Sequence, residues 1–136
     1  MTELRNFKVS SLTFENRVQN GSQLKLKNHF SYNVNYFENE KRCVAKLDYR
    51  VEEENLQPFS IRVEMEALFT YEEGDDRADI HTESFSQLFP FVRQIIHTAT
   101  SISGVPGLLI PMTKIEKGNV KIADRPEAPE ENSPLN

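Results

Sequence analysis

The chain has 136 residues, of which 27% are charged and 38% hydrophobic, and its formal net charge is −5. This length suits one domain with a modest core. The acidic balance argues against nucleic acid as a partner, because phosphate binding needs clustered Lys and Arg. The single cysteine, Cys43, excludes an intrachain disulfide and a cysteine-based zinc site within one subunit.

The N-terminal residues lack the long apolar core of a signal peptide, and no stretch approaches ~18 consecutive apolar residues. A reducing cytoplasm is therefore the expected location. Cys43 lies at an inward position of an expected strand, which predicts a buried and inert thiol.

Four segments in the first two-thirds of the chain show the two-residue period of half-buried strands. In the first of them the phase changes between Val9 and Leu12, which allows a β-bulge. Short polar links join the segments, and the acidic run 52–55 is expected to be a solvated hairpin turn. We therefore expect a four-stranded antiparallel sheet. The expected strands cover residues 7–14, 30–36, 43–51 and 57–71.

After an acidic loop at 71–79, the apolar period changes to three and four residues, which predicts one face of a helix of about four turns. Ser84 is a candidate N-cap, but Pro90 fits a first helical turn best. The helix is therefore predicted to start near Phe89, with a looser turn before it, and to stop at Gly104. The fold class is α+β, with this helix packed on one face of the sheet. The apolar helix positions are Phe85, Leu88, Phe89, Val92, Ile95, Ile96 and Ala99.

The histidines give no sign of a metal or catalytic centre. No two of His29, His81 and His97 lie three or four residues apart, and no nucleotide-binding or hydrolase motif is present. We therefore expect no enzyme activity, no metal and no cofactor.

The C-terminal residues from about Ala123 are rich in Pro, Glu and Asn, a composition typical of flexible segments. The expected organisation is one domain at 1–122 and an acidic flexible tail at 123–136. The apolar stretch 85–110 is larger than a small polar protein needs for one core, which predicts association with itself or with other chains.

A distinctive stretch runs through the expected helix and the turn after it, and a weaker one lies at 12–15 in the first strand. Together they resemble the SecB family of protein-export chaperones. Because the order and length of the strands also agree, the resemblance covers about residues 5–115. The matching residues are Leu88-Phe89-Pro90-Phe91, Arg93, Ile95-Ile96, Gly104, Pro106 and Leu108-Leu109, with Leu12-Thr13-Phe14-Glu15 as the weaker match.

This resemblance implies a cytoplasmic holdase that binds unfolded secretory polypeptides without ATP. It also implies a homotetramer, built as a dimer of dimers in which first strands pair and the helices lie between two sheets. For the strand positions a groove floor and a core face look alike in sequence, so both interpretations stay open. The implied client-binding groove contains Phe30, Tyr32, Val34, Phe91, Ile95, Val105, Pro106, Leu108 and Leu109.

The resemblance is incomplete where export-coupled members dock the motor SecA. Of the four docking positions only Glu15 is kept, and Ser11, Ser60 and Arg62 stand at the others. Arg62 reverses a charge and would repel the cationic tail of the motor, which argues against coupling. A second hypothesis therefore stays open: a dedicated SecB-like chaperone, or a regulatory partner, of one protein such as an antitoxin.

Overall fold

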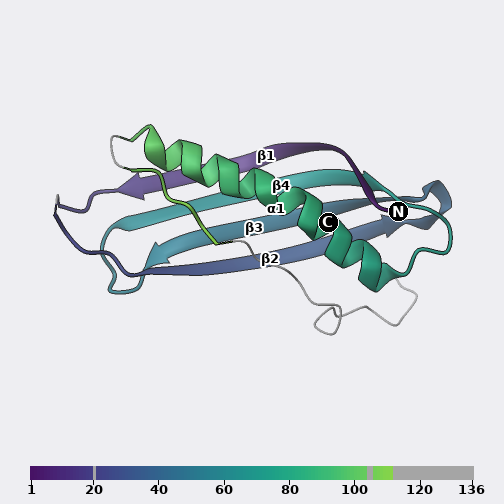
Figure 1. Cartoon of the computed structure of the whole chain (residues 1–136), viewed down its shortest axis with the longest axis horizontal. Coiled ribbons are helices and arrows are strands. Elements are labelled where there is room, and N and C mark those ends of the chain that lie inside the picture. Colours follow the sequence, from purple (N-terminus) through teal and green to yellow (C-terminus); the bar gives the residue numbers. More distant parts are fainter. Residues whose placement is uncertain (20, 104–105, 112–136) are drawn as a thin grey trace.

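The structure, a computed structural model, describes residues 1–19, 21–103 and 106–111. One antiparallel sheet in the order β1-β4-β3-β2 carries a single long helix that crosses one of its faces diagonally (Figure 1). This arrangement confirms the predicted α+β fold. The elements are β1 (Glu3–Asn16), β2 (Leu26–Phe37), the short 3-10 turn η1 (Glu38–Glu40), β3 (Arg42–Glu53), β4 (Phe59–Thr70) and α1 (Arg77–Ser101).

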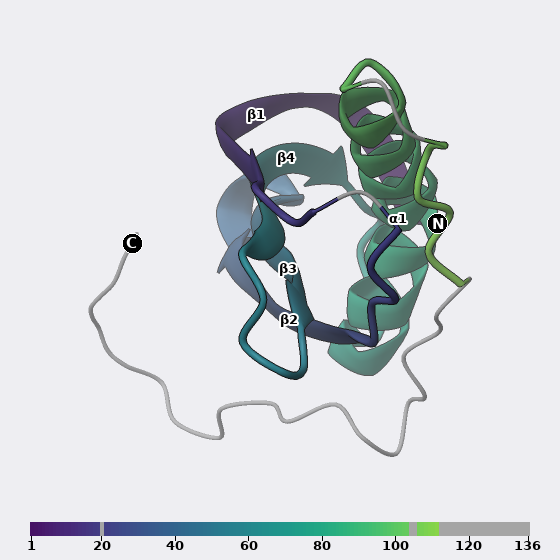
Figure 2. The same ribbon diagram turned by 90° about the vertical axis from the view of Figure 1, so that its left-hand side faces the viewer.

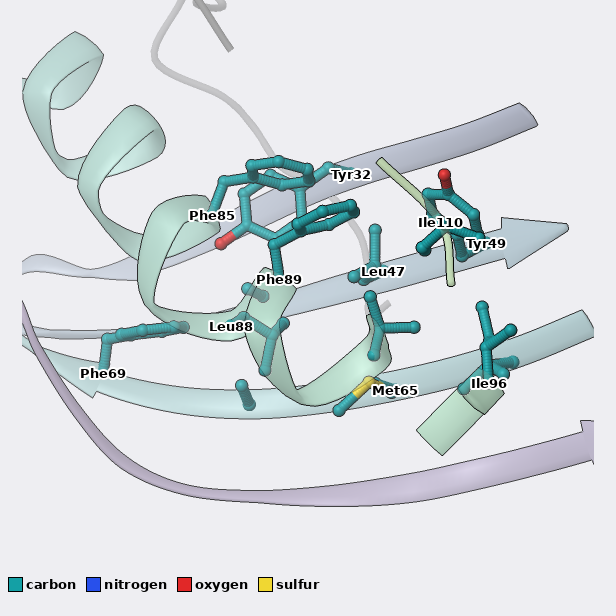
Figure 3. Close-up of a cluster of buried hydrophobic side chains, with 14 of the residues drawn as sticks. Tyr32, Leu47, Tyr49, Met65, Phe69, Phe85, Leu88, Phe89, Ile96 and Ile110 are labelled. Atoms are coloured by element: carbon teal, nitrogen blue, oxygen red, sulfur yellow. The ribbon is translucent and has the colours of Figure 1, made fainter. Parts of the chain in front are cut away.

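The two central strands, β3 and β4, bury alternate side chains on the helix-bearing face of the sheet. Leu47 and Met65 lie opposite each other in this ladder and are each 1% exposed. They join the buried helix residues Phe85, Leu88 and Phe89 in one cluster (Figure 3). A period of two on the strands and of three to four on the helix therefore brings both apolar faces into one core.

The opposite face of the sheet, here called the outer face, is charged. Arg62 donates two hydrogen bonds to Asp48 across the β3–β4 ladder, at 3.0 and 2.6 Å, and lies 3.7 Å from Glu64. Lys46 lies 3.8 Å from Glu66 on the same face. Such exposed pairs contribute at most about 1 kcal/mol each. The outer face is therefore a solvated surface in this subunit.

The helix begins earlier than predicted. It starts at Arg77 with Asp76 as its N-cap residue, runs through Pro90 and ends at Ser101. The predicted start near Phe89, the looser turn before it and the N-cap at Ser84 are therefore wrong. The predicted stop at Gly104 lies outside the described residues.

Burial accounts for the helical turns before Pro90. Ile80, Phe85 and Leu88 are at most 1% exposed. Burying each of them is worth about 1.5–3 kcal/mol, which together exceeds the ~3 kcal/mol cost of an interior proline. Pro90 itself is exposed to solvent, so its ring takes up no space in the core.

The edge strand β1 pairs with β4 and contains two register shifts, between Leu4 and Asn6 and between Val9 and Ser11. The second shift confirms the bulge predicted between Val9 and Leu12. It keeps both residues on the helix-bearing face, because they pair with the inward residues Met65 and Val63.

The acidic β3–β4 turn is less solvated than predicted. Glu53 is 5% exposed, and its carboxylate accepts backbone hydrogen bonds from Lys25, Asn55 and Gln57 at 2.9, 2.6 and 3.3 Å. These bonds, led by that from Lys25, hold the pKa of Glu53 below its usual value. The carboxylate therefore ties the turn to the segment before β2.

Cys43 is buried within β3, as predicted, and is a free thiol. Burial raises its pKa to about 12, so the reactive thiolate is scarce at neutral pH.

Candidate binding surface on the helix-bearing face

The chain after α1 turns back along the helix and contributes to its flank. Figure 2 shows residues 106–111 on the same side of the sheet as α1. The Leu108 amide donates to the Thr100 hydroxyl at 2.7 Å, and Arg93 Nε donates to the Ile110 carbonyl at 2.8 Å. Ile110 is 2% exposed and belongs to the same buried cluster as Tyr49. The returning segment is therefore part of the fold.

Gly107 allows this segment to lie close to the helix. A Cβ atom at this position would lie 2.6 Å from His97 Nε2 and 3.0 Å from the His97 carbonyl oxygen, closer than packed atoms come. Glycine therefore fixes the path of the segment, which leaves Leu109 67% exposed beside the buried Ile110.

Two aromatic side chains on the helix-bearing side are only partly covered. Phe30 on β2 is 40% exposed, although its ring stacks on Tyr49 and Phe85 with centroids 5.9 and 5.2 Å away. Phe91 on α1 is 37% exposed and meets Phe7 of β1 at 4.7 Å. Both rings are held in place by neighbouring rings while part of their area stays in water. Each is thus an ordered apolar side chain with part of its surface exposed.

Sequence reasoning missed a further apolar surface on β1. Val9 and Leu12 are 40% and 47% exposed, although they lie on the helix-bearing face. Their alternation with polar residues looked like that of any half-buried strand. The signal that could have found them is the phase change between them, because bulges concentrate at sheet edges. We define the apolar margin as the five exposed residues Val9, Leu12, Phe30, Phe91 and Leu109.

The predicted groove residues differ in burial. Tyr32 belongs to the core: it is 8% exposed, and its hydroxyl donates to the Ser84 hydroxyl at 2.6 Å. Val34, Ile95 and Leu108 are half-buried against that core. Phe30, Phe91, Pro106 and Leu109 are exposed, and Val105 lies outside the described residues.

The polar groups around Tyr32 are neutral. Burial raises the pKa of Tyr32, only partly offset by the hydrogen bond with Ser84. His81 meets the Tyr32 ring edge-on at 5.1 Å, and burial lowers its pKa. The surroundings of Tyr32 are therefore uncharged at neutral pH, which suits apolar side chains better than ionic ligands.

The described residues contain no group of three or more His, Cys, Asp or Glu side chains that could hold a metal ion. They also include no helix that is long and apolar enough to cross a membrane.

The four positions of the motor-docking resemblance, Ser11, Glu15, Ser60 and Arg62, share the outer face by their register in β1 and β4. Glu15 is exposed and lies 3.1 Å from Arg17. A cation therefore already sits beside the one docking residue that is kept.

The fold is similar to those of other solved structures. A SecB-like chaperone of Mycobacterium tuberculosis, in complex with a ChAD peptide from the HigA1 antitoxin, is 19% identical and superposes with a TM-score of 0.68. The match covers 82% of this chain and 90% of that chain. The fold is SecB-like. No protein-family model and no curated protein matches the chain.

A second match is a protein of unknown function from Streptococcus agalactiae, with 16% identity and a TM-score of 0.54 over 82% of this chain and 98% of that chain. The backbone similarity therefore covers both the sheet and the helix. At these identities, however, the shared feature is the backbone, and the binding chemistry has to be argued from this chain's own side chains.

Proposed function

We propose that this protein is a chaperone that holds unfolded polypeptides without ATP. The observation that carries the proposal is the apolar margin, whose ordered side chains stay exposed on the helix-bearing side of a SecB-like fold. Complete burial of such a side chain is worth about 1.5–3 kcal/mol, so covering the 37–67% of each that is exposed would gain part of that energy. Extended clients supply the apolar groups that cover them.

Binding would depend on many weak contacts. Phe30, Phe91 and Leu109 come from a strand, the helix and the returning segment, so they present separate contact points. A long unfolded chain that reaches several points at once binds more tightly than any short segment, because the later contacts form at high effective concentration. This mode needs no nucleotide.

Self-association belongs to the same proposal. We propose a homotetramer, with two dimers whose β1 strands and helices meet. The exposed Val9 and Leu12 on β1 support it, because pairing of β1 strands would cover them and leave Phe30, Phe91 and Leu109 for clients. In solution, static light scattering should give the mass of four chains of 15.7 kDa. A monomer at micromolar concentration would refute the assembly.

A second candidate is a dedicated chaperone of one protein. It is favoured by the similar M. tuberculosis structure, which holds an antitoxin peptide, and by the charge reversal at Arg62, which argues against docking to SecA. Either form of the proposal places the protein in the cytoplasm, where its clients are made.

The test is light scattering of a chemically unfolded client diluted into buffer without nucleotide. An equimolar or greater amount of the protein should suppress aggregation. No suppression of any client at a tenfold molar excess would refute the general holdase. Competition among several denatured proteins then separates the two candidates, because a dedicated chaperone prefers one client strictly whereas a general holdase ranks clients by apolar content.

A further inference from the structure

Three side chains on one face of α1 contact the segment that returns along the helix. Arg93, His97 and Thr100 are spaced by four and then three residues, which places them in a row on the helix surface. His97 lies so close to Gly107 that a Cβ atom there would come within 2.6 Å of its Nε2 atom. The returning segment therefore begins in close contact with this row.

Two hydrogen bonds from the row lie on either side of Leu109. The Leu108 amide donates to the Thr100 hydroxyl at 2.7 Å, and Arg93 Nε donates to the Ile110 carbonyl at 2.8 Å. The backbone before and after Leu109 is thus bonded to side chains of the helix.

The Thr100 hydroxyl uses both of its hydrogen-bonding roles. Thr100 is 1% exposed, and its hydroxyl donates to the Ile96 carbonyl at 2.8 Å while it accepts from Leu108. A buried hydroxyl that donates on one side and accepts on the other is held in one orientation. It therefore links the helix backbone to the returning segment.

Exposure alternates along this segment. Leu108 is half-buried, Leu109 is 67% exposed and Ile110 is 2% exposed. Such alternation is typical of an extended chain, in which neighbouring side chains point to opposite sides. A shift by one residue would exchange the exposed and the buried side chains. The two hydrogen bonds oppose that shift and so fix the register in which Leu109 faces outward.

We propose that Thr100 and Arg93 are positioning residues for client binding: by bonding the backbone on either side of Leu109, they hold its side chain outward. This inference rests on the proposed function and deepens it. A side chain that is already held in its binding position loses less conformational freedom when a client binds, which raises affinity. Thr100 is buried, so it acts on the client through Leu109.

A double-mutant cycle tests this arrangement. Thr100→Val keeps the shape of the side chain but removes the hydroxyl, and Leu109→Ala removes the exposed side chain. Fluorescence anisotropy gives the Kd of a labelled, reduced and carboxymethylated protein for each folded variant. Each substitution alone should weaken binding about threefold or more. In the Leu109→Ala background, Thr100→Val should cause no further loss, because the side chain that it positions is gone.

Phe91 provides the matched control. It is separated from Thr100 by about two and a half helical turns, so the two residues lie on opposite sides of α1. The losses of affinity in Phe91→Ala and Thr100→Val should therefore multiply in the double variant. Thr100→Ser retains the hydroxyl and should bind about as tightly as wild type.

Hydrogen exchange measures the hydrogen bond itself. Thr100→Val should speed the exchange of the Leu108 amide by roughly tenfold, whereas Thr100→Ser should leave it protected. Arg93→Met keeps an apolar stem but loses the donor to Ile110, and it repeats the cycle with Leu109→Ala at the second bond. This variant decides the outcome if Thr100→Val does not fold.

The outcomes separate this inference from the proposed function. The positioning role is refuted, while the proposed function stands, if the losses from Thr100→Val and Arg93→Met are the same with and without the Leu109 side chain. It is also refuted if these variants, or Leu109→Ala, bind the client like wild type. If wild type binds no client and protects none from aggregation, the proposed function fails and this inference fails with it.

Discussion

Leu56 has a left-handed backbone conformation, which a leucine residue disfavours. It has φ 65 at the tip of the β3–β4 turn and is 93% exposed. A branched side chain in the left-handed region costs about 1–2 kcal/mol, whereas Asn visits that region readily. Because the Leu56 side chain is exposed, burial does not offset this conformational cost.

We therefore expect Leu56→Asn to raise the free energy of unfolding by about 0.5–1 kcal/mol. Urea denaturation measures it. Leu56→Ala is the matched control: it removes the same apolar surface but lacks the side-chain amide with which Asn hydrogen-bonds the nearby backbone, so it should gain less. Equal stability of the two variants would contradict this explanation.

At the scale of the element, periodicity predicted the strands because each buries one face only. It placed the helix start wrongly because Pro90 carries a strong local signal, whereas the burial of Ile80 and Phe85 depends on a sheet formed by distant residues. Likewise, the sequence of the acidic turn at 52–55 did not indicate that the Glu53 carboxylate accepts hydrogen bonds from backbone amides, because its partner Lys25 lies far away in the sequence.

Pro90→Ala should therefore stabilise α1. The substitution restores one backbone donor and removes the ring clash, and since Pro90 is exposed it loses little packing. We expect the free energy of unfolding to rise by about 1–3 kcal/mol. Gln94→Ala, at another exposed helix position, should change it by a few tenths only. A destabilised Pro90→Ala variant would contradict this expectation.

The Glu53 turn predicts a specific acid response. Because its pKa is lower in the folded state than the usual 4.5, the carboxylate stabilises the fold above that pH, and this stabilisation is lost as the pH falls through the folded pKa. Glu53→Gln should be less stable than wild type at pH 7, and the gap should narrow in acid. Thermal unfolding from pH 7 to pH 3 measures it. A gap that stays constant would contradict the role of the charge.

At the scale of the whole molecule, the fold class was predictable from periodicity and from one recognisable helix and turn. The binding surface was predictable only in part, because exposure depends on which parts of a face the diagonal helix covers. Tyr32 and Phe30 are alternate residues of one strand face and both contact Phe85, yet Tyr32 is also covered by Ser84 and His81, while Phe30 stays 40% exposed. The strand period alone could not distinguish them.

The central claim is that the apolar margin binds unfolded chains, and matched charge substitutions test it most directly. Phe30→Asp and Phe91→Asp place a charge in the margin, whereas Leu56→Asp places one at an exposed leucine in the β3–β4 turn, outside the margin. The dissociation constant of a labelled, reduced and carboxymethylated client is measured by fluorescence anisotropy for folded variants. We predict at least tenfold weaker binding, ~1.4 kcal/mol, for the two margin variants and unchanged binding for Leu56→Asp. Equal affinities for all three variants and wild type would contradict the account.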